Sequence, residues 1–237
     1  WDRTLFPDPI AFAKAIHDRN LKLSLNDHPH AGIHYHEDDY EEVGRAIGHD
    51  TSKQAPILFD PTSPTFMKAY LDILHRNLEK KGCDFWWIDW QQGPISKVPG
   101  LDPLWLLNHF QFLDHTLHSP SRSLPIIFSR YAGPGSHRYP VGFSGDSIIS
   151  WESLAFQPEF TATASNIGYG WWSHDLGGHM HGSRDDELTA RWVQLGAFSP
   201  ILRLHSSNSP WSGKEPWTYR PEADKSMRVA MRYRHRL

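Results

Sequence analysis

The amino-acid sequence predicts an α/β fold in which six short strands alternate with helices, as in a (β/α) barrel. Short apolar runs alternate with longer stretches of helical period, which is typical of βα units on a parallel sheet. The expected strands end in or are followed by ionisable or strongly polar residues, and a barrel builds its site at the carboxyl ends of its strands. The length of 237 residues fits one sizeable domain, and we expect a single domain over 1–237.

Five of the six expected strands follow a helical stretch, and the short strand over about 141–144 follows the strand over 125–129. Helical period runs over about 9–19, 65–81, 102–116, 151–164, 185–196 and 222–237. The strands are expected over about 21–26, 85–89, 125–129, 141–144, 169–175 and 199–205. The second helix has the clearest start, because Ser63-Pro64 provides an N-cap followed by a proline at the first helical position.

Composition excludes some classes of partner and leaves one suggestion. The formal net charge of −3 gives no electrostatic reason to expect a nucleic acid or an anionic membrane as partner. A single cysteine, Cys83, excludes an internal disulfide framework. Eleven Trp, eight Tyr and twelve Phe could pack on sugar rings, but from the counts alone an aromatic-rich core is the favoured interpretation.

The ends and the apolar runs of the sequence indicate a piece of a longer chain. No apolar run approaches the roughly 20 residues that span a bilayer. The sequence opens on Trp1-Asp2-Arg3, without an initiator Met and without a basic-then-apolar signal pattern. We therefore expect an internal segment of a larger protein.

Polar residues collect where the expected strands end. A single aspartate after a strand is more often a loop residue or a helix N-cap, but repetition at nearly every strand end favours a shared site. The residues that follow or close the strands are His28, His30, Asp89, Arg130, Asp146, Asp175 and His205.

Two of these residues could form a catalytic pair. Asp89 follows four large apolar residues, which would desolvate its carboxylate; that environment suits either catalysis or a structural ion pair with an arginine. Asp146 follows Ser144-Gly145, where glycine permits a tight turn, and alone it would be read as a turn residue. Two carboxylates beside an arginine and a histidine match the needs of glycoside hydrolysis, in which one carboxylate attacks and one carboxylic acid protonates the leaving oxygen.

Several motifs resemble those of glycoside hydrolase family 31, the α-glucosidase and α-xylosidase family. Trp87-Ile88-Asp89 resembles its Trp-x-Asp nucleophile motif, and Ser129-Arg130 followed by Gly145-Asp146 resembles its arginine and acid/base segment. The segments His174-Asp175-Leu176-Gly177-Gly178, 191–200, Arg203-Leu204-His205 and Phe6-Pro7-Asp8-Pro9 also match in order.

The resemblance implies a role for each matched residue. Asp89 would be the nucleophile and Asp146 the general acid/base of a retaining α-glycoside hydrolase, most similar to an α-glucosidase. The substrate would be an oligosaccharide or another glycoside, and the family implies no cofactor and no metal. The residues expected to bind the sugar are Arg130, Asp175 and His205, with Trp87 and Trp172 as walls of the pocket.

Two departures from the family pattern accompany the resemblance. Trp90-Gln91-Gln92 stands where many α-glucosidases of the family have Met-Asn-Glu, which puts leaving-group preference in question. The match also implies an incomplete (β/α)8 TIM-type barrel with about strands three to eight present. The first two strands, a substrate-binding aspartate on the second, and the flanking β domains would then belong to missing parts of the parent chain.

Two other functions remain open from the residues alone. A metal-dependent barrel hydrolase could use His28-Pro29-His30 after the first strand, although His-x-His alone is a weak signal. Further ligands could come from His34, His36, His174, His179 and His181. A non-catalytic carbohydrate-binding relative is the other alternative, and retention of both Asp89 and Asp146 argues against it.

Overall fold

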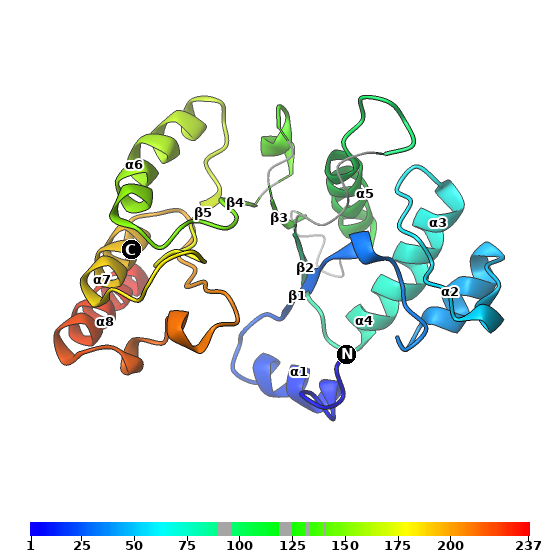
Figure 1. Cartoon of the computed structure of the whole chain (residues 1–237), viewed down its shortest axis with the longest axis horizontal. Helices are drawn as coiled ribbons and strands as arrows, with labels where there is room; N and C mark the ends of the chain where they lie inside the picture. Colours follow the sequence, from blue (N-terminus) through cyan, green and yellow to red (C-terminus); the bar gives the residue numbers. More distant parts are fainter. Residues whose placement is uncertain (90–95, 119–124, 131–132, 140) are drawn as a thin grey trace. The chain divides into compact units, whose positions relative to one another are not determined.

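The computed structural model describes residues 1–89, 96–118, 125–130, 133–139 and 141–237. The chain forms two compact units, Trp1–Ala132 and Gly133–Leu237. Each unit combines short strands with helices, as Figure 1 shows. The prediction of an α/β fold is therefore confirmed.

The first unit contains three parallel strands, which pair in the order β1–β2–β3. The strands are β1 (Ser24–Asp27), β2 (Phe85–Ile88) and β3 (Phe128–Arg130). The helices are α1 (Pro9–His17), α2 (Tyr40–Ile47), α3 (Pro64–Ala69), α4 (Arg76–Lys80) and α5 (Pro103–His118), with a π-helical segment over Tyr70–His75. As predicted, Ser63 caps α3 by accepting a hydrogen bond from the backbone N–H of Phe66.

The second unit contains two short parallel strands and three long helices. The strands are β4 (Gly142–Phe143) and β5 (Trp172–Ser173), and the helices are α6 (Trp151–Asn166), α7 (Asp186–Ala197) and α8 (Pro221–Arg236). Its core lies where α7 packs on α8, around the fully buried side chains of Val193 and Met227. A second cluster, with Leu176 and Trp192, joins α7 to the loop after β5.

Three elements differ from the sequence prediction. The stretch 199–205 forms only isolated parallel bridges, between Ile201 and Ser173 and between Leu204 and Leu176. Helix α2 was not expected, and the predicted helix over 65–81 is interrupted by the π-helical segment. Within the described ranges, no helix has the length and apolar character needed to cross a membrane.

Candidate active site

Strand alternation directs Trp87 and Asp89 to one face of the first unit's sheet. Trp86 points the other way, since its ring stacks on His75 at 3.8 Å between centroids and its N–H donates to Glu79. Because successive side chains of a strand point to opposite faces, Trp87 and the residue after the strand, Asp89, share the face away from these helical residues. The tilted contact of Trp87 with Phe128 of β3, 5.3 Å between ring centroids, lies on this face.

The same alternation brings Arg130 beside Asp89. Ser129 of β3 is fully buried and donates a hydrogen bond to Asn108 of α5, which places its neighbour Arg130 on the opposite face. The Arg130 guanidinium donates from Nε to Asp89 Oδ1 over 2.9 Å, and its Nη2 lies 2.7 Å from the same oxygen. The structure thus brings together two of the predicted site residues.

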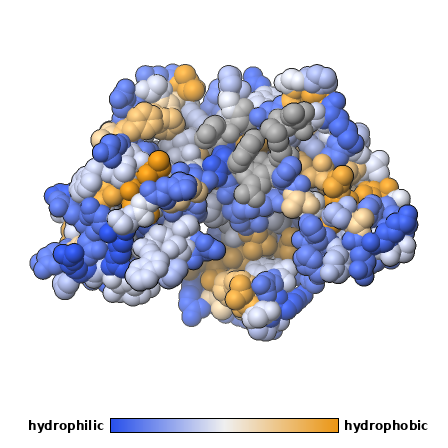
Figure 2. Space-filling model, in the orientation of Figure 1, coloured by the Kyte–Doolittle hydropathy of each residue, from blue (hydrophilic) through white to orange (hydrophobic). Residues whose placement is uncertain are grey.

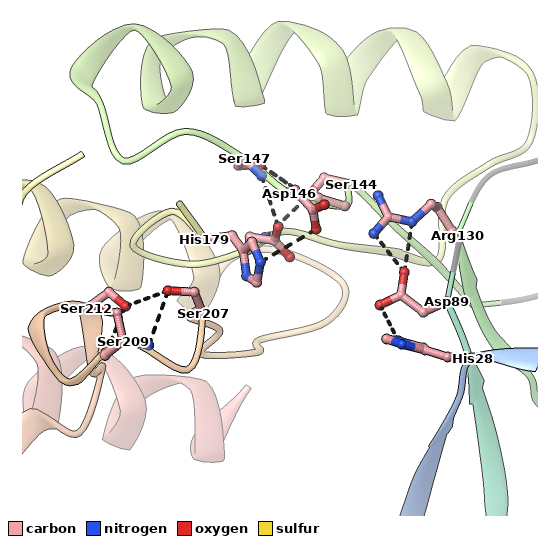
Figure 3. Close-up of polar contacts among 12 residues, drawn as sticks. His28, Asp89, Arg130, Ser144, Asp146, Ser147, His179, Ser207, Ser209 and Ser212 are labelled. Atoms are coloured by element: carbon pink, nitrogen blue, oxygen red, sulfur yellow. Dashed lines mark hydrogen bonds and ion pairs between the residues drawn. The ribbon is translucent and has the colours of Figure 1, made fainter. Parts of the chain in front are cut away.

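His28 contacts the other oxygen of the Asp89 carboxylate. It follows β1, whose Asn26 pairs in register with Trp87, and its Nε2 lies 3.3 Å from Asp89 Oδ2. Asp89 therefore lies between a guanidinium and an imidazole, with 14% of its side chain exposed (Figure 3). These contacts fix the orientation of the carboxylate.

In the second unit, Asp146 lies on a tight turn after β4. Gly145 adopts a left-handed conformation with φ of +73°, as the sequence suggested for this position. The Asp146 side chain is 43% exposed, and its Oδ1 lies 3.7 Å from Nε2 of His179. Asp146 is thus the more solvated of the two proposed catalytic carboxylates.

Asp175 is buried next to the Asp146 turn. Its carboxylate forms an ion pair with Arg203 and accepts a hydrogen bond of 3.1 Å from the backbone N–H of Ser147. Burial raises the pKa of the Asp175 carboxyl, and the Arg203 guanidinium opposes this effect. Arg203 also donates to Ser173 of β5, so this polar group joins β5 to the segment that carries His205.

His205 lies with these residues in the second unit. Its ring stacks on His179 with 4.6 Å between centroids and an interplanar angle of 11°. Of the predicted site residues in this unit, Asp146, Asp175 and His205 are thus joined through His179, Arg203 and Ser147. Figure 3 shows His179 and Asp146 pointing toward one another.

Trp172 is directed away from this group of residues. Its ring is 2% exposed and packs on Phe160 of α6 and on Tyr169, 4.8 and 5.0 Å between centroids. Trp172 and His174 share the helix-facing side of β5, whereas Ser173 and Asp175 face the other side. The expectation that Trp172 walls a sugar pocket is corrected here, because strand alternation turns its ring into the core under α6.

The histidines considered as metal ligands are dispersed in the structure. His28 contacts Asp89, and His174 is buried and bonded to Gln157 and Thr161 of α6. Across the described residues, no group of three or more His, Cys, Asp or Glu side chains is arranged to hold a metal ion. The departure at Trp90-Gln91-Gln92 lies outside the described residues.

Parallel strands that alternate with helices and carry polar side chains at their carboxyl ends are typical of (β/α)-barrel enzymes. The model of the glycosyl hydrolases family 31 TIM-barrel domain matches residues 1–237, so this chain belongs to glycoside hydrolase family 31. The predicted family and the partial TIM-type barrel are thereby confirmed.

Curated relatives carry two kinds of name. An α-xylosidase of Emericella nidulans is 27% identical over 96% of this chain and 31% of its own length. Neutral α-glucosidase C of Homo sapiens is 23% identical over the whole of this chain and 29% of its own length. The chain thus spans under a third of the length of these relatives.

Solved structures agree on the fold. A family 31 α-xylosidase from a soil metagenome, complexed with xylose, superposes with a TM-score of 0.75 at 21% identity over 98% of this chain and 40% of that chain. The glucosidase II α subunit superposes with a TM-score of 0.77 at 20% identity over 99% of this chain and 29% of that chain.

Sequence reasoning overlooked two of the residues that organise the site. Arg203 was noted only as part of a motif, yet it forms the ion pair with Asp175. It stands two positions before His205, and this spacing on an extended segment would have placed both on one face. His28 was predicted as one of several strand-end residues and as a metal ligand, but not as a partner of Asp89, although it follows a strand adjacent to the one that precedes Asp89.

Proposed function

We propose that this segment is the catalytic part of a retaining α-glycosidase that releases a terminal α-linked sugar, with α-glucosides as its main substrates. Asp89 is the nucleophile and Asp146 the general acid/base. The observation that carries the proposal is the setting of Asp89, whose carboxylate is held between Arg130 and His28 at the carboxyl end of β2. A nucleophilic carboxylate needs to be ionised and aimed, and these two contacts support both.

The reaction follows as a double displacement. An oxygen of Asp89 attacks the anomeric carbon and the bond to the leaving oxygen breaks, while Asp146 gives its proton to that oxygen. Water then attacks the glycosyl ester, the Asp146 carboxylate takes the proton from the water, and Asp89 is released. This mechanism needs the two carboxyl groups roughly 5–5.5 Å apart, which is the separation we propose for the full-length protein.

Three further residues are proposed to hold hydroxyl groups of the cleaved sugar, namely Arg130, Asp175 and His205. Their types support this role, because a guanidinium donates, a carboxylate accepts, and an imidazole can do either. Trp87 is proposed as an apolar wall, since it shares the sheet face of Asp89. We also propose that 1–237 is a single partial catalytic domain, completed by the first two barrel strands and flanking β domains of the parent chain.

The proposal is tested by substrate profiling of the full-length protein. Initial rates are measured on aryl α-glucosides, α-xylosides, α-galactosides and α-N-acetylgalactosaminides, and proton NMR follows the anomer released first. We expect the highest kcat/KM on α-glucosides and an α-configured first product. A preference for α-xylosides would keep the mechanism and change the sugar, in line with the names of relatives. A β-configured first product, or no turnover of any α-glycoside, would contradict the proposal.

A further inference from the structure

His179 occupies a position that the proposed roles leave unexplained. Its backbone N–H donates to the carbonyl of Ser147 over 2.7 Å, and its own carbonyl accepts from the N–H of Ser207 over 3.1 Å. The preceding Gly178 has φ of +80°, and a Cβ there would lie 2.7 Å from the backbone of Ile149. The backbone of His179 is therefore fixed against the turn that carries Asp146.

The ring of His179 is fixed as well. It stacks almost parallel on His205, and its side chain is only 17% exposed. Its Nε2 is directed at Oδ1 of Asp146, 3.7 Å away (Figure 3). Among the contacts that the structure describes, the carboxylates of Asp146 and Asp175 and the ring of His205 are the titratable groups that face this imidazole.

The surroundings of Nδ1 determine which nitrogen of His179 carries the proton. This atom is buried and has no hydrogen-bond partner among the described residues. A buried N–H without an acceptor is costly. The tautomer with its proton on Nε2, the atom that faces Asp146, is therefore favoured over the one with its proton on Nδ1.

We infer that His179 is a positioning residue for the acid/base: its Nε2–H donates to Oδ1 of Asp146 and orients the carboxyl group for proton exchange with the substrate. The inference rests on the proposed role of Asp146. In the free protein, the distance of 3.7 Å between Nε2 and Oδ1 is too long for a hydrogen bond. Such contacts in active sites often shorten when substrate binds. The stack on His205 then links proton transfer to a residue proposed to hold the sugar.

Three substitutions in the full-length protein separate the functions of the ring. His179→Phe keeps an aromatic ring to stack on His205 and removes the donor. His179→Gln places an amide N–H at a similar reach, whereas the shorter His179→Asn does not reach Asp146. The exposed His181, with φ of +53°, offers a matched control, because asparagine tolerates this conformation.

The readouts are the pH profile of kcat, which reports the enzyme–substrate complex in which the contact shortens, and the dependence of kcat on the leaving group. A donor to the carboxylate favours the charged form, so its loss in His179→Phe raises the pKa of the acid/base and moves the alkaline limb to higher pH. We also expect kcat to fall on the order of tenfold on poor leaving groups. His179→Gln should return the alkaline limb toward the wild-type position, while His179→Asn should resemble His179→Phe and His181→Asn the wild type.

The outcomes distinguish this inference from the function on which it rests. Wild-type pH limbs and leaving-group dependence in His179→Phe would overturn it, provided that Asp146→Ala behaves as an acid/base variant. If His179→Phe does not fold, the Gln and Asn variants decide, and equal profiles for the two would overturn the inference. If Asp146→Ala shows no leaving-group dependence, the acid/base assignment itself is wrong and the role of His179 falls with it.

Discussion

Asp89 and Asp146 have different environments, and each environment suits a different step. The Asp89 side chain is 14% exposed and contacts two potentially cationic groups, whereas Asp146 is 43% exposed on a turn. A nucleophile has to stay ionised and aligned, while an acid/base has to exchange protons with a leaving group and then with water. We therefore expect the two carboxylates to respond differently to substitution.

Replacing each carboxylate by alanine in the full-length protein should give different kinetics. Asp89→Ala should abolish turnover of every substrate, because no glycosyl-enzyme can form. Asp146→Ala should lose on the order of a hundredfold or more with poor leaving groups and much less with aryl glycosides or fluorides, which need little protonation. Steady-state rates across a leaving-group series measure both effects.

Azide provides the control for this assignment. It needs no general base, so it should partly restore Asp146→Ala and yield an α-glycosyl azide from the intact glycosyl-enzyme. A β-configured azide from the Asp146→Ala variant would mean that the two roles are exchanged.

At the scale of elements, buried polar residues join β5 to α6. His174 is fully buried, and its two ring nitrogens contact Gln157 over 2.9 Å and Thr161 over 3.1 Å. Burial lowers the pKa of His174 to about 4, from an ordinary value of 6.5. The folded protein therefore keeps this ring neutral at pH values where the unfolded chain protonates it.

This difference makes stability fall with acidification. Because the pKa of His174 is lower in the folded than in the unfolded protein, the contribution of the neutral ring to stability is fully present above pH 6.5 and is lost as the pH falls toward 4. At pH 5 this loss lowers the free energy of unfolding by about 2 kcal/mol relative to pH 7. The free energy of unfolding is measured by urea denaturation of the full-length protein at a series of pH values. It should fall less steeply with acidification in His174→Gln, whose side chain cannot titrate. His235→Gln, at an exposed position, should keep the pH dependence of the wild type, and an equal pH dependence in all three proteins would contradict the prediction.

Alternating apolar runs and helical period predicted most elements, because both are local patterns. The π-helical segment could not be read this way, since it depends on tertiary contacts. Tyr70 and His75 both reach Asp27 of β1, and residues five apart share a face only when the helix widens. The same limit explains Trp172, whose direction follows from the exact residues that pair in β5.

The sequence also predicted part of the candidate site. Strand ends and motifs selected Asp89 and Arg130, and the structure places them in contact. They could not show that His28 and His179 contact the two proposed catalytic carboxylates, because a loop histidine has no local pattern that specifies its partner.

At the scale of the whole molecule, the chain presents much apolar surface. Phe198, Trp211 and Trp217 are 78%, 83% and 70% exposed, and Figure 2 shows apolar residues at the surface of both units. Among the described strands, β1 pairs with β2 alone, so one of its edges is open. Open strand edges and apolar patches both favour association with other chains.

Residues 1–237 expressed alone should therefore be aggregated or poorly soluble, without measurable α-glycosidase activity. A (β/α)8 barrel closes with eight strands, and the structure describes five strands and two isolated bridges that continue the sheet. Size-exclusion chromatography and assays on aryl α-glycosides check this expectation against the full-length protein. A monodisperse, cooperatively melting and active 237-residue protein would show that the segment needs no further strands.

The central claim is that Asp89 forms a covalent bond to the sugar, and trapping of the glycosyl-enzyme tests it most directly. The full-length protein is incubated with a 5-fluoro-α-glycosyl fluoride, whose second fluorine slows release of the intermediate, and peptides are analysed by mass spectrometry. We expect one glycosyl unit per chain, attached to the carboxylate of Asp89, with no label in Asp89→Ala. Inactivation with the label on any other residue would contradict it.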